Sequence, residues 1–528
     1  MAFAYPRYDF QPTPDQVAAT PPRHPVVVVG AGPVGLALAI DLASRGCKTV
    51  LLDDDTGVSN GSRGLCYAKR TLEIFERLGC AAPMLAKGVT WQVGKVFHGP
   101  AQIYAFDLLP ESGHRFPAFV NLQQYWLEKF LVDRALSLPH LDLRFASKAV
   151  SVAPHADRVD IDVETPQGAY TIQADWLVAC DGARSPTRKM LGLDFKGRVF
   201  EDRFLIADVR MQAAFPTERW FWFDPPFHAG GSTLLHKQPD DLWRIDFQLG
   251  RDADPEAERR PEAVIPRVQA MLGADVPFEL EWVSVYTFQC RRLERFRHGR
   301  VLFAGDSAHQ VSPFGARGAN SGVQDADNLG WKLACVMAGE APENLLDSYD
   351  AERIPAADEN IRHSTQATDF ITPKGAAARL FRNAALELAR EHAFARRLVN
   401  SGRLSMPARY EASPLSSADD PAFAGGPAPG APALDAKRES GGFLLDALKG
   451  DFCAISFGVE IDLGGRIPTA CIHADEKLVW ARYDAAPGTV YLFRPDQHVC
   501  YRARTFDRDA ILRAHARALG KEMQAWPN

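Results

Sequence analysis

A glycine-rich segment that directly follows a run of valines narrows the possible folds of this chain more than any other feature. Val26 to Val29 form a continuous β-branched run, typical of a strand buried on both faces of a parallel sheet. The next residues, Gly30-Ala31-Gly32-Pro33-Val34-Gly35, have the spacing GxGxxG and open an apolar stretch that predicts a helix to about Arg45. Thr49 to Leu52 is a second apolar run and ends at Asp53. This order predicts a βαβ unit.

Each residue of this loop suits a bound dinucleotide. Gly30 permits the tight turn, Gly32 lets the backbone approach a pyrophosphate, and Gly35 lets the helix pack closely on the strand. The helix N-terminus favours an anion. Asp53 lies at about the distance along the chain, ~20 residues, at which an acid binds the ribose hydroxyls. The sequence therefore predicts a site for an ADP moiety, with a purely structural glycine turn as the alternative.

Length and composition indicate a multidomain enzyme and argue against nucleic acid and membrane as partners. The chain has 528 residues, whereas single cores stop growing near ~250–300 residues. Its formal net charge of −6 provides no global basic surface for nucleic acid or anionic lipid. We find no secretory signal and no apolar run of the ~20 residues that a bilayer crossing needs. The nine cysteines include no C-x-x-C pair, so we expect reduced thiols, no metal site and a cytoplasmic protein.

Further periodic segments predict how the chain is divided. Helical spacing predicts helices at 70–78, 123–136 and 321–337, and helical sequence continues to about Val399. Aromatic and β-branched runs between 193 and 289 predict an inserted sheet. A stretch rich in Pro, Gly, Ala and Ser predicts a linker. The expected domains are an N-terminal extension (1–22), the first parts of a dinucleotide-binding domain (23–192), a β-sheet domain (193–289), the return of the first domain with helices (290–400), a linker (401–433) and a C-terminal domain (434–528).

Two further motifs, taken together with the glycine loop, resemble those of a known enzyme family. The first is Asp181-Gly182-Ala183-Arg184-Ser185, directly after an apolar run. The second is Gly305-Asp306-Ser307-Ala308-His309, which leads into Pro313-Phe314-Gly315-Ala316-Arg317-Gly318-Ala319-Asn320. In order and spacing the three motifs resemble the FAD-dependent aromatic hydroxylases, the single-component flavoprotein monooxygenases that include para-hydroxybenzoate and phenol hydroxylases. The resemblance covers about residues 25–355.

The resemblance implies FAD as the cofactor and assigns residues to it. Asp306 matches the acid that binds the ribityl chain, and Asp181-Gly182 matches a motif that serves both FAD and the passing nicotinamide. The segment with Gly305, Gly315, Gly318, Ala319 and Asn320 matches the loop whose backbone N–H groups face the pyrimidine edge of the flavin. Arg63 and Gln124 match cofactor contacts, with an ordinary surface role as the alternative. Pro313 matches a proline whose carbonyl contacts the substrate.

The resemblance also implies the chemistry. NADH or NADPH, which has no second Rossmann fingerprint in this sequence, is expected to reduce the flavin. O2 then adds at flavin C4a, and the C4a-hydroperoxyflavin hydroxylates a phenolic or otherwise electron-rich aromatic compound, as in aromatic catabolism. The choice between the two nicotinamides stays open, and so does the oligomeric state, with a homodimer as one option.

The inserted sheet is expected to cover the flavin and bind the substrate. Arg244 to Gln248 resembles the Arg-x-x-x-Gln strand of para-hydroxybenzoate hydroxylase, which places Arg244 in the catalytic site. His236 matches a substrate-facing residue and is our candidate general base for a phenol, because the pKa of histidine lies near working pH. Gln238 stands where that enzyme has a carboxylate-binding arginine, which counts against a simple benzoate. The expected ring pocket also includes Trp220, Trp222 and His228, with packing in the sheet as the alternative for the tryptophans and a structural role as the alternative for His236.

Other functions on the same scaffold stay open. Trp220-Phe221-Trp222 resembles part of the signature of flavin-dependent halogenases, and an epoxidase, a hydroxylating decarboxylase or a flavin-binding protein without turnover are further alternatives. The C-terminal domain resembles the thioredoxin-like tail of larger phenol hydroxylases but lacks C-x-x-C, so we expect a part in folding or subunit contact. The predicted fold class is α/β: a Rossmann-like FAD-binding domain with an inserted β-sheet substrate domain, a helical segment and a C-terminal thioredoxin-like α/β domain.

Overall fold

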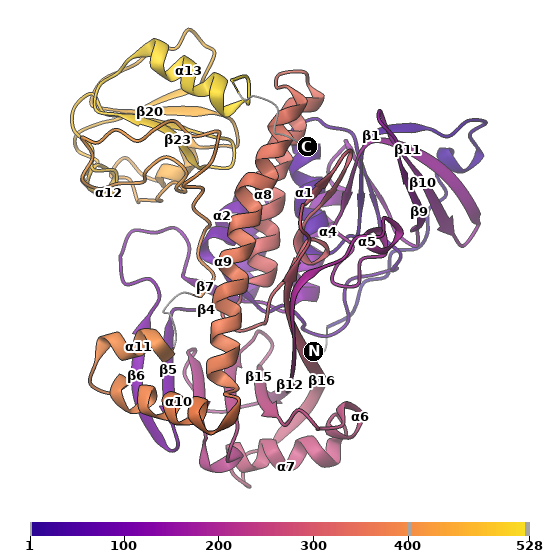
Figure 1. Ribbon diagram of the computed structural model, residues 1–528, viewed down its shortest axis with the longest axis vertical. Helices are drawn as coiled ribbons and strands as arrows, with labels where there is room; N and C mark the ends of the chain where they lie inside the picture. Colours follow the sequence, from indigo (N-terminus) through magenta and orange to yellow (C-terminus); the bar gives the residue numbers. More distant parts are fainter. Residues whose placement is uncertain (1–2, 400–403, 523–528) are drawn as a thin grey trace.

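The computed structural model describes residues 3–399 and 404–522. Figure 1 shows two large sheets joined by long helices, with the C-terminal domain and the second sheet at opposite ends of the long axis. Parts of four expected domains lie outside the described residues: 1–2 of the extension, 400 of the returning dinucleotide-binding domain, 401–403 of the linker and 523–528 of the C-terminal domain.

The first sheet contains the predicted βαβ unit. β1 (Arg23–Val29) pairs in parallel with β2 (Thr49–Leu52) and with β11 (Gly168–Ala179). β8 (Leu141–Arg144) lies beyond β2, and β18 (Val301–Phe303) lies beyond β11, again in parallel. Because helices cover a parallel sheet, its strands are apolar on both faces, and Val26, Val27 and Val28 are fully buried. A smaller set of antiparallel strands extends this sheet: β9 (Lys148–Pro154), β10 (Val159–Thr165) and β17 (Arg297–His298).

Helices pack on this sheet at the positions that the sequence predicts. α1 (Pro33–Ser44) follows the glycine loop and packs against α4 (Gln124–Leu136) and α8 (Gly318–Met337). α2 (Lys69–Arg77) also contacts α8. The helices predicted at 70–78, 123–136 and 321–337 are therefore confirmed, with α8 starting three residues earlier, inside the glycine-rich loop. Short elements complete this region: α3 (Ala81–Lys87), α5 (Pro186–Met190) and a three-stranded sheet of β3 (Cys66–Ala68), β7 (Phe119–Asn121) and β4 (Val89–Trp91).

The second sheet has eight strands in the order β19-β16-β12-β15-β14-β13-β5-β6. The predicted inserted strands form its centre: β12 (Lys196–Met211), β13 (Arg219–Phe223), β14 (Ser232–Lys237), β15 (Leu242–Leu249) and β16 (Phe278–Arg292). The sheet also extends beyond the expected range 193–289. Its other strands are β5 (Val93–His98), β6 (Ala101–Asp107) and β19 (His309–Gln310). The chain therefore enters this sheet before, during and after the insertion.

Different helices cover the two faces of the second sheet. α7 (Pro261–Leu272), next to the short α6 (Pro255–Glu258), packs on one face through Val264 and Val268. The other face meets the end of α9 (Asp347–Ile371), α10 (Gly375–Ala389) and α11 (Ala393–Val399) in an aromatic cluster with Phe204 and Phe288. The helical sequence expected up to Val399 is confirmed. The cavity described below lies on this second face.

The C-terminal domain has a four-stranded sheet in the order β21-β20-β22-β23. The strands are β20 (Cys453–Phe457), β21 (Thr469–Ile472), β22 (Val490–Phe493) and β23 (Val499–Ala503), and the helices are α12 (Lys477–Arg482) and α13 (Arg508–Ala518). The domain is α/β as expected, and its likeness to thioredoxin stays a prediction.

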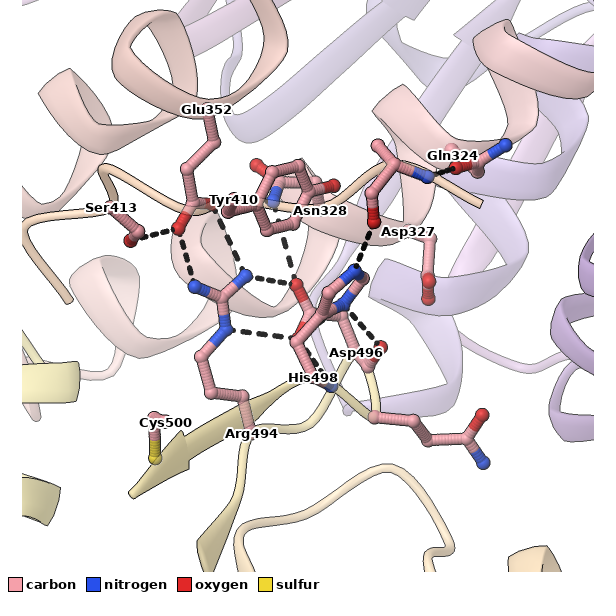
Figure 2. Close-up of polar contacts among 12 residues, drawn as sticks. Gln324, Asp327, Asn328, Glu352, Tyr410, Ser413, Arg494, Asp496, His498 and Cys500 are labelled. Carbon is pink, nitrogen blue, oxygen red and sulfur yellow. Dashed lines mark hydrogen bonds and ion pairs between the residues drawn. The ribbon is translucent and has the colours of Figure 1, made fainter. Parts of the chain in front are cut away.

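A buried network of charges fixes the C-terminal domain to α8 and α9 (Figure 2). Arg494 contacts both carboxylate oxygens of Glu352 on α9 and also pairs with Asp496. Lys332 on α8 donates to Glu352 at 2.7 Å, and Asn328 donates to the same oxygen at 2.6 Å. Burial alone would raise the pKa of Glu352, but the two cations lower it to about 2. The carboxylate is thus held in its charged form.

The predicted linker has no regular secondary structure where it is described, yet it packs tightly. Tyr410 is buried, its ring stacks on His498 at 4.4 Å between centroids, and its hydroxyl accepts a hydrogen bond from Arg353 on α9 at 3.2 Å. Leu415 is fully buried. The segment therefore acts as a packed layer between α9 and the C-terminal domain.

Candidate functional site

The loop between β1 and α1 forms an open cradle at the carboxyl edge of the first sheet. Gly30 has φ +102°, and a Cβ there would lie 2.6 Å from the carbonyl oxygen of Cys180. A Cβ at Gly35 would overlap the carbonyl oxygen of Gly30, whereas a Cβ at Gly32 would meet no atom within 4 Å. Gly30 and Gly35 are therefore required by the packing of the protein, independently of any ligand. The space beside Gly32, where Pro33 and Val34 begin α1, is the place for a bound anion.

Asp53 lies beside this cradle. Its carboxylate accepts hydrogen bonds from the backbone N–H of Ala31, inside the loop, and from that of Asp55 at 2.9 Å. Burial raises the pKa of Asp53 to about 6, and these hydrogen bonds only partly oppose the effect. A partly buried carboxylate at this position suits the hydroxyl groups of a ribose.

The two downstream motifs meet at the same edge, because β11 and β18 are neighbouring parallel strands. The N–H of Ala304 donates to Ala179 at 3.0 Å, and Arg188 bridges the motifs by donating to the carbonyls of Ser307 at 3.0 Å and Ala183 at 2.9 Å. Gly182 has φ +75° and open space beside it. The structure therefore brings the Asp181-Gly182 and Gly305-Asp306 segments together.

Acidic side chains in these motifs keep unused hydrogen-bonding capacity. One oxygen of Asp181 accepts from the N–H of Thr187 at 2.9 Å, and the other is buried without a partner. Asp306 is exposed, and within the described residues its carboxylate accepts no hydrogen bond. Both arrangements suit a ligand that brings donors of its own.

Gly305 and Gly322 allow the close approach of Val34 at the start of α1. A Cβ added at Gly305 would lie 2.9 Å from Cγ2 of Val34, and a Cβ added at Gly322 would lie 2.6 Å from the same atom.

A second set of contacts supports the Gly305 turn from behind. The N–H of Gly305 donates to Asp325 on α8 at 3.0 Å, and Asp325 also pairs with His309 at 2.6 Å and with Arg353 of α9 at 2.6 Å. All three of these side chains are buried. His309 and Arg353 therefore fix the carboxylate that holds the Gly305 turn.

Some residues assigned to the cofactor use their side chains within the protein. The amide of Asn320 accepts from Ala68 N–H at 2.8 Å and from Thr71 at 2.6 Å, and it donates to backbone carbonyls. Gln124 accepts from Gly64 N–H at 2.9 Å and donates to Glu128 at 2.7 Å. Asn320 and Gln124 therefore hold loops in place with their side chains, and the N–H of Gln124 also donates to the carbonyl of Ser62 at 3.2 Å.

The remaining assigned positions differ in exposure. Arg63 is exposed at φ +29° and Pro313 is exposed, whereas Gly315 is buried at φ +98°, against the guanidinium of Arg317. Gly318 and Ala319 are partly exposed at the start of α8.

A row of polar side chains crosses the second sheet on the face toward α9. His236 lies opposite Arg244, Arg244 opposite Asp208, and Asp208 opposite Trp282. Asp208 accepts from Arg244 at 3.1 Å, from Gln238 at 2.7 Å and from Ser62. Arg244 also donates to the carbonyl of Arg63 at 2.8 Å. Arg244 and Asp208 therefore tie the Ser62-Arg63 segment to the sheet, and Gln238 supports Asp208.

His236 is buried in this row and is neutral. Burial lowers its pKa well below the ordinary value, and Arg219 and Arg244 lower it further. Its Nδ1 has no hydrogen-bond partner. A neutral imidazole with a free nitrogen can accept a proton, so the role of general base stays a hypothesis.

The structure does not bring Trp220, Trp222 and His228 to this face. Trp220 and Trp222 contact Phe97 and lie in the cluster that packs on α7. The Nε2 atom of His228 lies 2.7 Å from the carbonyl oxygen of Gln248. The alternation of β13 turns Arg219, Phe221 and Phe223 to one face and the two tryptophans to the other. His228 lies after β13, and none of the three residues is among those that line the cavity described below.

A cavity lies between β5, β13, α9 and the loop after Pro313. Phe314 and Gly315 of that loop form one wall, so the cavity adjoins the segment matched to the flavin. The lining is mainly apolar and includes two arginines: Arg219, Arg317, Phe106, Phe221, Phe223 and Ile371 are among its residues. The sequence reasoning missed Arg219, Asp208 and Asp246. The only sequence signal for Arg219 is that it is a charged residue at the start of an aromatic strand.

A glycine cradle at the carboxyl edge of a parallel sheet, with a second sheet beside it, defines an FAD-dependent enzyme with a separate substrate region. The residues fit FAD: there is room at Gly32 and Gly182, and Asp53, Asp181 and Asp306 offer acceptors. The chain belongs to the FAD-binding flavoprotein monooxygenase family, whose model, described as "FAD binding domain", matches residues 23–364.

Relatives and solved structures agree with this assignment. The chain is 30% identical to a flavin-dependent monooxygenase of Mycobacteroides abscessus over 90% of this chain and 96% of that protein. It is 34% identical to a 12-dehydrotetracycline 5-monooxygenase/anhydrotetracycline 6-monooxygenase of Streptomyces rimosus, over 66% of this chain and 70% of the relative. The flavin-dependent monooxygenase PieE, solved with FAD and substrate, has the same fold, with a TM-score of 0.81, 23% identity and coverage of 95% and 100% of the two chains.

The protein is therefore an FAD-dependent monooxygenase of the class that acts on aromatic substrates, with NAD(P)H as the typical co-substrate. Among the described helices, none combines the length and apolar character that a membrane span requires.

Proposed function

We propose that this protein uses NAD(P)H and O2 to hydroxylate a phenolic or otherwise electron-rich aromatic compound in the cavity beside Phe314 and Gly315. The observation that carries the proposal is the aromatic lining of this cavity directly against the loop matched to the flavin. When bound, FAD supplies the hydride acceptance and the oxygen activation that amino acid side chains do not provide.

The chain's own residues would bind and orient both partners. The Gly32 cradle and the α1 N-terminus would hold the pyrophosphate, and Asp53 the ribose. Phe221, Phe223 and Phe314 would exclude water and hold the substrate ring by edge or face contacts, which fixes the ring carbon relative to the cofactor. The free Nδ1 of His236 would accept the proton of a ring hydroxyl.

The test is substrate-stimulated oxidation of NADH and of NADPH by the purified FAD-loaded protein. The panel would contain single-ring phenols and fused-ring phenols, because a relative is named for action on tetracycline precursors. We expect at least one phenol to accelerate oxidation of one nicotinamide and to yield a product heavier by one oxygen atom, labelled from 18O2. Flavin-loaded protein that consumes no additional nicotinamide with any phenol would refute the proposal.

Halogenation is the second candidate, and the structure gives its sequence signal another explanation. Trp220 and Trp222 pack with Phe97, Phe215 and Phe227 in the aromatic layer under α7, which accounts for them as core residues. Chlorinated product in the same assay, run with chloride, would favour the halogenase. An epoxidised or decarboxylated product would identify the other scaffold alternatives.

Location and assembly are further parts of the proposal. All nine cysteines are free, which supports a reducing compartment such as the cytoplasm. A homodimer stays a hypothesis, which light scattering of the holoenzyme would test.

A further inference from the structure

We propose that Arg219 binds an anionic oxygen of the substrate, so that the enzyme selects aromatic compounds that carry a carboxylate or another ionised oxygen beside the ring. This inference rests on the proposed function, because it names the substrate class of the same cavity. It concerns a residue that plays no part in the cofactor cradle.

The first observation is that Arg219 is buried and lines the cavity without a partner. It is the first residue of β13, its exposed fraction is 8%, and it shares the cavity wall with Phe221 and Phe223. Across residues 3–399 and 404–522, its guanidinium has no hydrogen bond and no ion pair. Buried charges in proteins are normally paired, so an unpaired guanidinium that faces a cavity indicates a ligand of opposite charge.

Other buried arginines of the chain show the contrast. Arg244 pairs with Asp208, Arg353 with Asp325, and Arg494 with Glu352. The protein thus supplies a carboxylate to each of these guanidinium groups. At Arg219 it supplies none, although Asp246 is near enough to influence its charge.

The second observation is that other polar groups around Arg219 are also unsatisfied. Nδ1 of His236 and Oδ1 of Asp246 are both buried without a hydrogen-bond partner. Trp220 pairs with Leu235, so the preceding Arg219 and the following His236 are neighbours, and the charge of Arg219 lowers the pKa of His236. Phe221, Leu234 and Asp246 form the next row on the same face. Three neighbouring groups therefore have free capacity in one region of the sheet.

The chemistry of the cavity specifies the ligand. The apolar lining by Phe106, Phe221, Phe223 and Phe314 suits a planar ring, and the planar fork of Arg219 suits a carboxylate. Arg317, which also lines the cavity, adds a second positive charge. An aromatic acid or an ionised hydroxy-aromatic compound supplies both the planar ring and the negative charge that this lining favours.

The experiment compares acids with their amides on the holoenzyme. The probes are 1-hydroxy-2-naphthoate and 3-hydroxycinnamate, each with its matched carboxamide, and binding is followed by the change in flavin absorbance. For at least one pair we expect the acid to bind at least about 10-fold more tightly than the amide. Arg219→Gln should remove this preference, and Arg219→Lys should restore part of it, because lysine keeps the charge but not the fork.

A matched control is Lys95→Met. Lys95 also lies at this cavity, but its Nζ pairs with Glu218 at 2.8 Å. The preference for the acid should persist in this variant. A second measurement guards against misfolding: Arg219→Met should melt at the same temperature as the wild-type holoenzyme or at a higher one, because it removes an unpaired buried charge. A structural role for Arg219 predicts a lower melting temperature.

The outcomes separate this inference from the proposed function. Equal binding of acid and amide throughout the panel, an acid preference that survives in Arg219→Gln, or a lower melting temperature of Arg219→Met would overturn the inference, even if phenols are hydroxylated. An Arg219-dependent preference for acids without any stimulated oxidation of NAD(P)H would support the inference and refute the proposed function.

Discussion

Replacing Glu352 by Gln should destabilise the protein strongly, because this carboxylate is the centre of the charge network between α9 and the C-terminal domain. It is 2% exposed and accepts from Arg494 (Figure 2), and it also accepts from Lys332 and Asn328. The cations lower its pKa from 4.5 to about 2, against the effect of burial, which corresponds to about 3 kcal/mol. Loss of one partner of a buried ion pair costs a similar amount, about 3–5 kcal/mol. The amide group of Gln would also turn a donor toward other donors.

Thermal unfolding followed by circular dichroism would measure the effect, with Asp358→Asn as the control on the same helix. Asp358 pairs with Arg292 at 2.6 Å, but its side chain is 52% exposed, so this substitution should cost less than about 1 kcal/mol. Because the folded-state pKa of Glu352 is lowered, its contribution is present above pH 4.5 and disappears as pH falls from 4.5 toward 2. Equal melting temperatures of the two variants at pH 7 would refute the reasoning.

Three further predictions concern the cofactor loop and the second sheet. Gly32→Ala should leave the apoprotein as stable as wild type but weaken FAD binding in a fluorescence titration. Gly35→Ala should lower the melting temperature of the apoprotein, because its Cβ overlaps the Gly30 carbonyl. The opposite pattern would contradict the assignment of Gly32 to the FAD site. Asp53→Asn should weaken FAD binding by about 10-fold or more through the loss of a charged hydrogen bond. Wild-type affinity should fall as pH drops through about 6, where Asp53 gains a proton, and the variant should lack this dependence. Phe221→Ala should raise KM about 10-fold by removing an apolar contact in the cavity. Trp222→Phe should leave KM unchanged while lowering thermal stability. A larger KM effect for Trp222 than for Phe221 would instead support a ring pocket lined by the tryptophans.

The cofactor half of the site follows from the sequence because its chemistry depends on local backbone. The valine strand, the glycine turn and Asp53 lie in one short segment, residues 26–53, and the steric limit on Gly35 comes from Gly30 within the same turn. The limit on Gly30 comes from Cys180, directly after the neighbouring strand β11, and is not visible in the local sequence. The family resemblance then assigns Asp181 and Asp306 to FAD, and the structure shows that both follow neighbouring parallel strands at the same sheet edge.

The substrate half could not be predicted in the same way. In β13 every residue is aromatic or charged, so alternation alone does not say which set faces the cavity, and a shift of one residue exchanges Trp222 for Phe221. The pairing of β5 with β13 joins segments more than 100 residues apart, which local patterns do not encode. The unpaired state of Arg219 is likewise a property of its surroundings.

The predicted linker shows a related limit. Its Pro- and Gly-rich composition correctly indicates the lack of helices and strands, but composition does not report burial. Tyr410 and Leu415 are buried because α9 and the C-terminal domain enclose them.

The charge network has a consequence for how this chain could change in evolution. A gene shortened to end before the C-terminal domain would leave Glu352 and Lys332 without Arg494 and would uncover Trp331, which packs on Phe452. The shortened product would expose the Glu352–Lys332 pair and a large apolar surface near the C-terminal end of α8 and the N-terminal end of α9. Loss or replacement of the domain would therefore require simultaneous changes in these helices, so the two parts should be inherited together rather than exchanged as modules.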